Sequence, residues 1–288
     1  MIKMQNVSFQ YGDFTALDSV SLHEKEPIIA GLWGRNGAGK TTLMKLLSGL
    51  EKPTSGDILV NTTSPINNSE AMKHVTYMQE NHPFSQHWSV NDALRFGAYF
   101  NPQWDQSWAE YLVELFELPR KKKINKFSKG MQTMVKIVIG LASKAPITIM
   151  DEPTNGLDAH MRKKFYQALL ESYEDDPRFI FLSTHHIDEI ESLCEKIAVV
   201  HAKTIIRYEE TDQLKQQGIL LSGEESLVRD FIKSSIIIEE RRLGKQISVM
   251  IDQRYTEEWE QLANQKGVSI EKAPLQDYLV NVTTKGVR

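Results

Sequence analysis

The sequence contains only one cysteine, Cys194, and no long apolar run. A single cysteine excludes a framework of intrachain disulfides and fits a reducing compartment, and we expect it to be a buried helix residue. No window approaches the roughly 18 to 20 apolar residues of a membrane-spanning helix, so any membrane role is expected to depend on a partner chain. The first residues, MIKMQNVSF, alternate like a strand and lack the apolar core of a signal peptide. Together these absences predict a cytoplasmic chain.

The chain also lacks a strong excess of charge of one sign. It has 34 Lys and Arg against 38 Asp and Glu, and 41% of its residues are hydrophobic, which is typical of a globular protein. Because there is no global basic field, nucleic-acid binding is the weaker hypothesis. Single hydrophobic cores usually stop growing near about 250 residues. For 288 residues we therefore expect one principal domain with a small appendage.

What is present is an alternation of short apolar runs with longer helical patterns, which predicts an α/β domain with a mostly parallel sheet. Open α/β sheets bind ligands at the carboxyl ends of their strands, so polar residues that follow the runs are candidate site residues. From residue 83 to about residue 130 the sequence is aromatic and helical in spacing, which predicts a helical insert. The apolar runs are EPIIAGLWG, HVTYMQE, APITIMDEP, FIFLSTHH and KIAVVHA.

From about residue 218 the pattern reads strand, helix, two strands joined at Leu243-Gly244, helix and strand. This βαββαβ order is that of a ferredoxin-like unit. We therefore predict a main domain over residues 1–217 and a small C-terminal α/β domain over residues 218–288. The last helical stretch, LQDYLVNVT, is predicted to be a docking helix, and the small domain shows no catalytic constellation.

The segment GLWGRNGAGKTT contains the pattern G-x-x-x-x-G-K-[ST] between an apolar strand and a helical pattern. Its glycines allow backbone N–H groups to curl around phosphate oxygens, and the helix N-terminus adds partial positive charge. Lys40 is expected to reach the β and γ phosphates, and the Thr41 hydroxyl is a candidate ligand for Mg²⁺. A glycine-rich turn that binds nothing is the alternative, but strand, loop and helix follow in the required order. The predicted nucleotide-binding residues of this loop are Gly34, Arg35, Asn36, Gly37, Ala38, Gly39, Lys40, Thr41 and Thr42.

Two adjacent acids, Asp151 and Glu152, end the apolar run APITIM. Carboxylates that close a buried strand are unfavourable unless a cation or a proton transfer uses them. In P-loop NTPases an aspartate at this place holds Mg²⁺, and a neighbouring carboxylate can act as general base. A solvated strand end is the alternative interpretation. The phosphate loop in the same chain favours the functional one.

Six motifs in order make residues 1 to about 215 resemble the nucleotide-binding subunit of ABC transporters. They are the phosphate loop, YMQE, the helical insert, FSKGMQ, ITIMDEPTNGLD and LSTHH. SKGM together with FNPQWD is similar to a bacterial subgroup of type-2 exporters. The resemblance implies a P-loop ATPase fold with a mixed sheet core and a helical subdomain, and it implies ATP and Mg²⁺ as cofactors.

The resemblance also assigns roles to single residues. Tyr11 matches the aromatic that stacks on adenine, although a core tyrosine near a turn is the alternative. Gln79 matches a glutamine that contacts Mg²⁺ or the attacking water, and His185 matches the switch histidine at the γ phosphate. Asp158 belongs to a loop that crosses the dimer interface in the family. The implied catalytic residues are Lys40, Gln79, Glu152 and His185, and the implied Mg²⁺ ligands are Thr41, Gln79 and Asp151.

The stretch NKFSKGMQ departs from the common signature Leu-Ser-Gly-Gly-Gln. Ser128 and Gly130, the hydroxyl donor and the small backbone contact, are retained. Lys129 and Met131 differ, although an added cation near a γ phosphate is not unfavourable in sign. In this family the signature loop of one subunit faces the phosphate loop of another. The resemblance therefore implies that Ser128, Gly130 and Asp158 serve a nucleotide held between two chains.

The implied function is that of the ATPase subunit of an exporter of peptides, antibiotics or lipids. Such a subunit works as a homodimer or heterodimer with a transmembrane permease at the inner face of the cell membrane, with no nucleic acid involved. A soluble ABC ATPase of translation or DNA repair is the alternative, but the former usually carry two cassettes and the latter long coiled coils. This sequence has one phosphate loop and no sustained heptads. A small-molecule kinase would leave the paired acids and the switch histidine unexplained.

Overall fold

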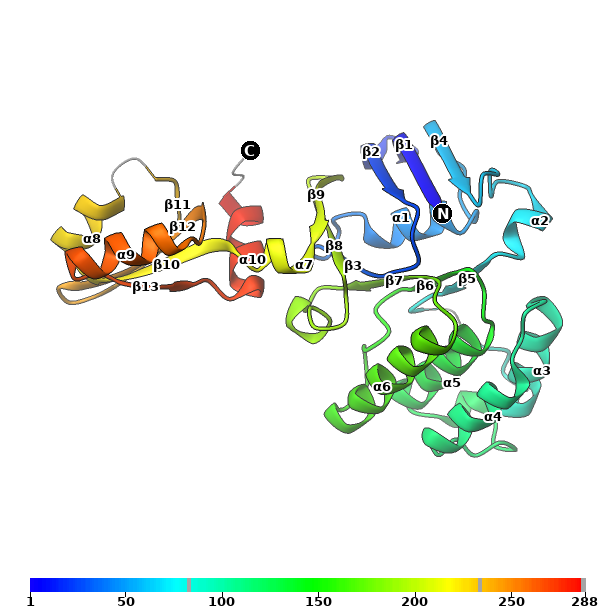
Figure 1. The fold of residues 1–288 in the computed structure, drawn as a ribbon. Helices are drawn as coiled ribbons and strands as arrows, with labels where there is room; N and C mark the ends of the chain where they lie inside the picture. Colours follow the sequence, from blue (N-terminus) through cyan, green and yellow to red (C-terminus); the bar gives the residue numbers. More distant parts are fainter. Residues whose placement is uncertain (82–83, 233–234, 286–288) are drawn as a thin grey trace. The chain divides into compact units, whose positions relative to one another are not determined.

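The computed structural model describes residues 1–81, 84–232 and 235–285, and the chain forms two compact units (Figure 1). The first unit comprises Met1–His185 and Leu193–Tyr208, and the second comprises His186–Ser192 and Glu209–Arg288. Residue 83, where the helical insert was predicted to begin, and residue 288, where the small domain was predicted to end, lie outside the described residues.

The first unit is built on a six-stranded sheet in the order β5-β6-β7-β3-β8-β9 (Figure 1). The pairs β5/β6, β6/β7, β7/β3 and β3/β8 are all parallel, so the predicted mostly parallel sheet is confirmed. Every residue of β3, β6 and β7 is buried, which explains their continuous apolar runs. The strands are β3 (Ile29–Trp33), β5 (Val75–Met78), β6 (Ile147–Met150), β7 (Phe179–Thr184), β8 (Lys196–His201) and β9 (Thr204–Glu210).

A second, antiparallel sheet in the order β2-β1-β4 completes the mixed sheet core. The N-terminal strand was predicted, whereas its two neighbours were not. One continuous apolar cluster joins this sheet to helix α1 and to the six-stranded sheet, so the two sheets share a single core. The bounds are β1 (Ile2–Tyr11), β2 (Phe14–Glu24), β4 (Ser55–Val60) and α1 (Lys40–Leu47).

Helices occupy the predicted insert and the segments on both sides of β6. Most begin where a polar side chain caps the first turn: Ser89 and Asp92 form a capping box at α3, and Asp105 accepts from Trp108 N–H at α4. From residue 84 to β6 the described chain has no strand, only an isolated bridge between Ser89 and Lys123. The elements are α2 (Ser69–Met72), α3 (Val90–Phe100), α4 (Gln106–Leu115), η1 (Ile124–Lys126), α5 (Lys129–Ala142) and α6 (Ala159–Asp175).

The second unit confirms the ferredoxin-like βαββαβ order. Its four strands form an antiparallel sheet in the order β11-β12-β10-β13, with α8 and α9 sharing its apolar core. The last helix, α10, contacts β10, β11 and η2. The elements are η2 (Ile187–Glu189), α7 (Thr211–Leu214), β10 (Gln217–Glu224), α8 (Glu225–Ile232), β11 (Ile237–Leu243), β12 (Gln246–Arg254), α9 (Glu257–Lys266), β13 (Ser269–Lys272) and α10 (Leu275–Lys285).

Cys194 is buried, with 5% of its surface exposed, but it does not lie on a helix. We expected a helix there, yet the short helix η2 ends at Glu189 and β8 begins at Lys196. The chain must become extended there to pair with β3, where Lys196 lies opposite Ala30. The demands of the sheet therefore override the expected helix.

Burial raises the pKa of the Cys194 thiol above its usual value. Because the thiolate is the reactive form, we expect thiol reagents to label the folded chain only when it opens. Labelling followed by absorbance or mass should be many times slower in native buffer than in guanidinium. Equal rates in the two conditions would contradict the buried position.

Candidate functional site

The phosphate loop leads from β3 into α1, and α1 begins without a side-chain cap. No acidic residue lies in its first turn, whereas α3, α4, α5 and α6 all carry a capping side chain. Gly39, at the N-cap, has φ 112, and a Cβ there would lie 2.6 Å from Leu17 Cδ2. The first N–H groups of α1 thus remain available to an anion, at a position that only glycine fits.

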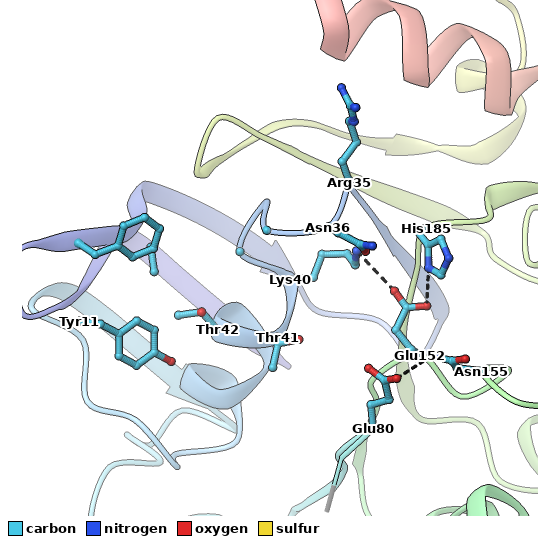
Figure 2. A pocket seen from close by; sticks show the side chains of 14 residues that line it. Tyr11, Arg35, Asn36, Lys40, Thr41, Thr42, Glu80, Glu152, Asn155 and His185 are labelled. Carbon is cyan, nitrogen blue, oxygen red and sulfur yellow. Dashed lines mark hydrogen bonds and ion pairs between the residues drawn. The ribbon is translucent and has the colours of Figure 1, made fainter. Parts of the chain in front are cut away.

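A pocket of about 460 Å³ lies beside this loop (Figure 2). It gathers predicted residues from segments far apart in the sequence, including Tyr11, which is 44% exposed and therefore not a core tyrosine. Gly34 and Ala38 belong to the loop but do not line the pocket. The lining residues are Tyr11, Phe14, Ala16, Arg35, Asn36, Gly37, Gly39, Lys40, Thr41, Thr42, Glu80, Glu152, Asn155 and His185.

Glu152 lies between a cation and an imidazole on the wall of this pocket (Figure 2). Its Oε1 is 3.5 Å from Lys40 Nζ, and its Oε2 is 2.9 Å from His185 Nδ1. Lys40 Nζ also donates to the carbonyl oxygen of Gly34 at 2.6 Å. Lys40 and Glu152 are both buried. The arrangement places a carboxylate that can accept a proton next to the loop where phosphates would bind.

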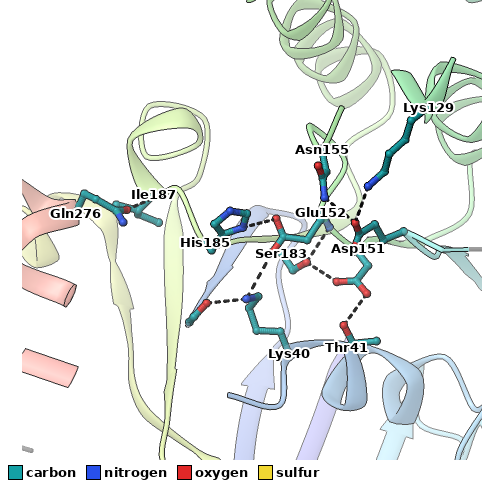
Figure 3. Close-up of polar contacts among 12 residues, drawn as sticks. Lys40, Thr41, Lys129, Asp151, Glu152, Asn155, Ser183, His185, Ile187 and Gln276 are labelled. Atoms are coloured by element: carbon teal, nitrogen blue, oxygen red, sulfur yellow. Dashed lines mark hydrogen bonds and ion pairs between the residues drawn. The ribbon is translucent and has the colours of Figure 1, made fainter. Parts of the chain in front are cut away.

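Asp151 is surrounded by hydroxyl groups (Figure 3). Its Oδ2 accepts hydrogen bonds from Thr41 Oγ1 at 2.8 Å and from the Tyr77 hydroxyl at 3.4 Å. Its Oδ1 accepts from Ser183 Oγ at 2.6 Å. Burial and the neighbouring Asp151 raise the pKa of Tyr77, so its hydroxyl stays a donor. Asp151 is only 2% exposed.

The oxygen atoms of Thr41 and Asp151 fit a Mg²⁺ ion, which is usually bound through one or two carboxylates together with substrate phosphates and waters. Asp151 has no Lys or Arg partner in the part of the chain that the structure describes. A buried carboxylate without a cationic partner is suited to a bound cation. Among the described residues no three His, Cys, Asp or Glu side chains gather as a metal site.

Ser183 is a site residue that the sequence analysis missed. Its Oγ donates to Asp151 and accepts from the backbone N–H of Glu152 at 2.9 Å. Glu152 has φ 48, in the left-handed region that is unfavourable for a residue with a side chain. Ser183 therefore stabilises a strained backbone that carries both acids. A serine inside the apolar run FIFLST is the signal that could have identified it.

Glu80, Asn155 and Phe14 were also missed. Glu80 and Asn155 both line the pocket, and Asn155 Nδ2 donates to Glu80 Oε1 at 2.6 Å. Phe14 pairs with Tyr11 across the turn between β1 and β2 and is 59% exposed. The available signals were an acid directly after Gln79, an amide three residues after Glu152, and a second aromatic three residues after Tyr11.

Besides Gly34 and Ala38, five predicted residues do not line the pocket: Asp151, described above, and Gln79, Ser128, Gly130 and Asp158. Gln79 does not line the pocket, although the next residue, Glu80, does. The backbone carbonyl of Gln79 accepts a hydrogen bond from Lys136 Nζ at 3.2 Å. Ser128 caps α5 by accepting from Met131 N–H, and Asp158 caps α6 by accepting from Met161 N–H. Gly130 packs so closely that a Cβ would lie 2.5 Å from the carbonyl oxygen of Gly156. Ser128 and Asp158 are exposed, so their surface is open to another molecule.

Comparison with known proteins gives consistent results. Residues 17–155 match the ABC transporter family. The bacitracin transport ATP-binding protein BcrA of Bacillus licheniformis is 30% identical over 221 residues, which cover 76% of this chain and 72% of that protein. The lantibiotic transport ATP-binding protein SrtF of Streptococcus pyogenes is 29% identical over 244 residues, 84% of this chain and 100% of that protein.

Solved structures agree on the fold. A dimeric structure of a bacterial ABC transporter cassette is 25% identical to this chain and superposes with a TM-score of 0.64, covering 73% of this chain and 99% of that chain. The likeness therefore covers about three quarters of this chain and nearly the whole of that cassette.

Ser183→Ala tests the support of the two acids. The change leaves the buried N–H of Glu152 and one oxygen of Asp151 without a partner, which costs about 1–3 kcal/mol of unfolding free energy, and it should lower ATP hydrolysis. Denaturant unfolding and a phosphate-release assay measure the two effects. Ser222→Ala removes a comparable Oγ contact, 3.2 Å to Ser248 Oγ in the second unit, and should leave hydrolysis unchanged. Parent-like hydrolysis by Ser183→Ala would contradict the role of Ser183.

Proposed function

Because this chain belongs to the ABC transporter family as an ATP-hydrolysing, nucleotide-binding subunit, we propose that it powers export across a membrane by closing with a second ATPase subunit around ATP. The position of Glu152 between Lys40 and His185, beside the phosphate loop, is the observation that carries this proposal. In the proposed domain organisation the ATPase domain spans residues 1–217, with its helical subdomain over residues 83–130, and the small domain spans residues 218–288.

In the proposed mechanism the phosphates of ATP lie on the N-terminus of α1, and Lys40 exchanges its contact with the carbonyl of Gly34 for the β and γ phosphates. Thr41, Asp151 and Gln79 would hold Mg²⁺, which would neutralise phosphate charge. Tyr11, exposed on the pocket wall, stacks on adenine. Glu152 accepts a proton from the attacking water, and His185 orients Glu152 and contacts the γ phosphate.

The second subunit supplies what this pocket lacks. Ser128, Gly130 and Asp158 lie in the same unit as the phosphate loop but outside its pocket. A two-fold pair places the signature loop of each chain on the nucleotide of the other. The Ser128 hydroxyl, which accepts from Met131 N–H, can still donate to a phosphate. ATP favours the closed pair because it contacts both chains only in that state, and hydrolysis releases the contact.

The helical subdomain offers a surface for the permease. Three aromatic side chains of α3 are exposed: Phe96 at 48%, Tyr99 at 83% and Phe100 at 57%. The ring of Phe96 contacts that of Trp88 in a tilted arrangement, with 4.6 Å between ring centroids, and both line a shallow groove with Asp92, Arg95 and Tyr99. Exposed aromatics rimmed by charge are typical of protein interfaces. A loop of the permease would dock here and follow the closure of the pair.

The names of two relatives support a proposal for the cargo. BcrA is named for bacitracin transport and SrtF for lantibiotic transport, which favours a peptide or antibiotic cargo over a lipid. No helix of the described residues is long and apolar enough to cross a membrane. We propose that a separate permease spans the membrane and that this chain is bound to its cytoplasmic face.

Glu152→Gln tests the general base. The variant should bind MgATP with the affinity of the parent and hydrolyse it at least about 10²-fold more slowly, because an amide cannot take the proton. It should also accumulate as a closed pair in MgATP, measured by light scattering after size exclusion. Hydrolysis at the parent rate would show that Glu152 is not the base.

A second substitution tests whether Ser128 acts on the partner's nucleotide or on the nucleotide of its own chain. Ser128→Ala added to Glu152→Gln should abolish the trapped pair while the affinity of a single chain for MgATP stays unchanged. A large loss of affinity in the single chain would place Ser128 in its own pocket and contradict the head-to-tail arrangement.

Tyr99→Asp tests the permease surface. A charge at the centre of an aromatic patch should weaken docking by about tenfold or more and leave ATP hydrolysis by the isolated chain unchanged. The measurement is retention of a multi-spanning protein from solubilised membranes, identified by mass spectrometry. Leu243→Asp is the control, because Leu243 is 85% exposed in the second unit. If Tyr99→Asp retained the membrane protein as well as Leu243→Asp and the parent do, this surface would be excluded as the docking site.

A further inference from the structure

Lys129 occupies the place of a glycine in the common signature, and its side chain is engaged within its own chain (Figure 3). Lys129 Nζ lies 3.2 Å from Glu80 Oε1. Its stem passes over Gly156, where a Cβ would lie 3.3 Å from Lys129 Cγ and 3.4 Å from Lys129 Cδ. A glycine at position 129 could make neither contact. The departure from the signature therefore adds a connection to the molecule.

Glu80 is the point where this connection meets two other segments. Its Oε1 also accepts from Asn155 Nδ2 at 2.6 Å, and its backbone carbonyl accepts from Lys136 Nζ at 2.6 Å. Lys129 and Lys136 lie about two turns apart on α5 and so share one face of the helix. Both lysines hold the segment that follows β5, one through the side chain of Glu80 and one through its backbone.

Asn155 extends the contacts to the proposed general base. The backbone N–H of Asn155 donates to the carbonyl oxygen of Glu152 at 3.1 Å. The backbone carbonyl of Asn155 accepts from Thr133 Oγ1 of α5 at 3.4 Å. A continuous set of contacts thus runs from Lys129, next to Ser128, through Glu80 and Asn155 to Glu152.

We propose that Lys129 is a positioning residue that acts through Glu80 and Asn155 to fix the signature loop relative to the loop that carries Glu152. This inference rests on the proposed function, in which Ser128 serves the partner's nucleotide and Glu152 serves the nucleotide of its own chain. When the signature loop of a chain has closed on the partner's nucleotide, Lys129 holds the loop that carries Glu152 in the same chain in position for that chain's own nucleotide. The expected consequence is cooperative hydrolysis.

The size of the effect follows from the exposure of the pair. Lys129 is 56% exposed and Glu80 is 26% exposed at the side chain, and pairs of this kind contribute about 0–1 kcal/mol to stability. Removing the charge should therefore barely change folding. It should instead lower the rate of ATP hydrolysis, because the pair sets the signature loop relative to the loop that carries Glu152.

Lys129→Met is the test, because methionine keeps an unbranched stem over Gly156 and removes the charge. We expect kcat for ATP to fall about twofold to fivefold, the Hill coefficient for ATP to fall toward one, and the affinity of the single chain for ATP to stay unchanged. Lys129→Arg should retain most of the rate. Lys73→Met is the control, because Lys73 pairs with Glu70 at 2.7 Å and is similarly exposed, at 49%.

Glu80→Gln keeps an acceptor for Asn155 and removes the charge that Lys129 meets. In a double-mutant cycle the two single changes and the double change should lower kcat by about the same factor, because each breaks the same pair. Additive effects, or parent kinetics in Lys129→Met, would overturn the inference. If the parent chain itself hydrolyses ATP without forming a pair, the proposed function fails instead, so the two failures are distinguishable.

Discussion

The parallel alignment of β5, β6, β7 and β3 is the constraint on which the site depends. Parallel neighbours place their carboxyl ends at one edge of the sheet, and the residues that leave that edge are Glu80 after β5, Asp151 and Glu152 after β6, His185 after β7 and the phosphate loop after β3. Ser183, the last residue but one of β7, joins two of these ends by bonding both Asp151 and the backbone of Glu152. Strand order therefore brings these side chains together at one edge of the sheet.

Around that edge the charges form two connected sets. Lys40, Glu152 and His185 line the pocket that we propose receives a nucleotide, and Lys129, Glu80 and Asn155 connect the signature loop to the same acidic segment. Asn155 contacts Glu152 through the backbone, so the sets are continuous. The two unusual residues of the signature thus differ: the side chain of Lys129 pairs with Glu80, whereas Met131 donates its backbone N–H to Ser128.

Sequence patterns predicted the parallel strands and the C-terminal βαββαβ order well, because buried parallel strands are continuous apolar runs and half-buried elements alternate clearly. They did not predict β2 and β4. The pairing of β1 with β2 shifts register between Met4 and Val7 and again between Val7 and Phe9, and Asn6 and Ser19 have φ 50. Such bulges break the period-two alternation that identifies a strand. Cys194 was misplaced for a related reason, since pairing of β8 with β3 overrides the expected helix.

The sequence by itself determined the phosphate loop, the paired acids, His185 and the signature loop as candidate site segments, because each is recognised from neighbours along the chain. Tertiary structure alone decided which of these segments meet. Ser183 reaches Asp151 across 32 residues and Lys129 reaches Glu80 across 49, and neither contact can be derived from local spacing. The first depends on the pairing of β6 with β7, and the second depends on the packing of α5 against β5.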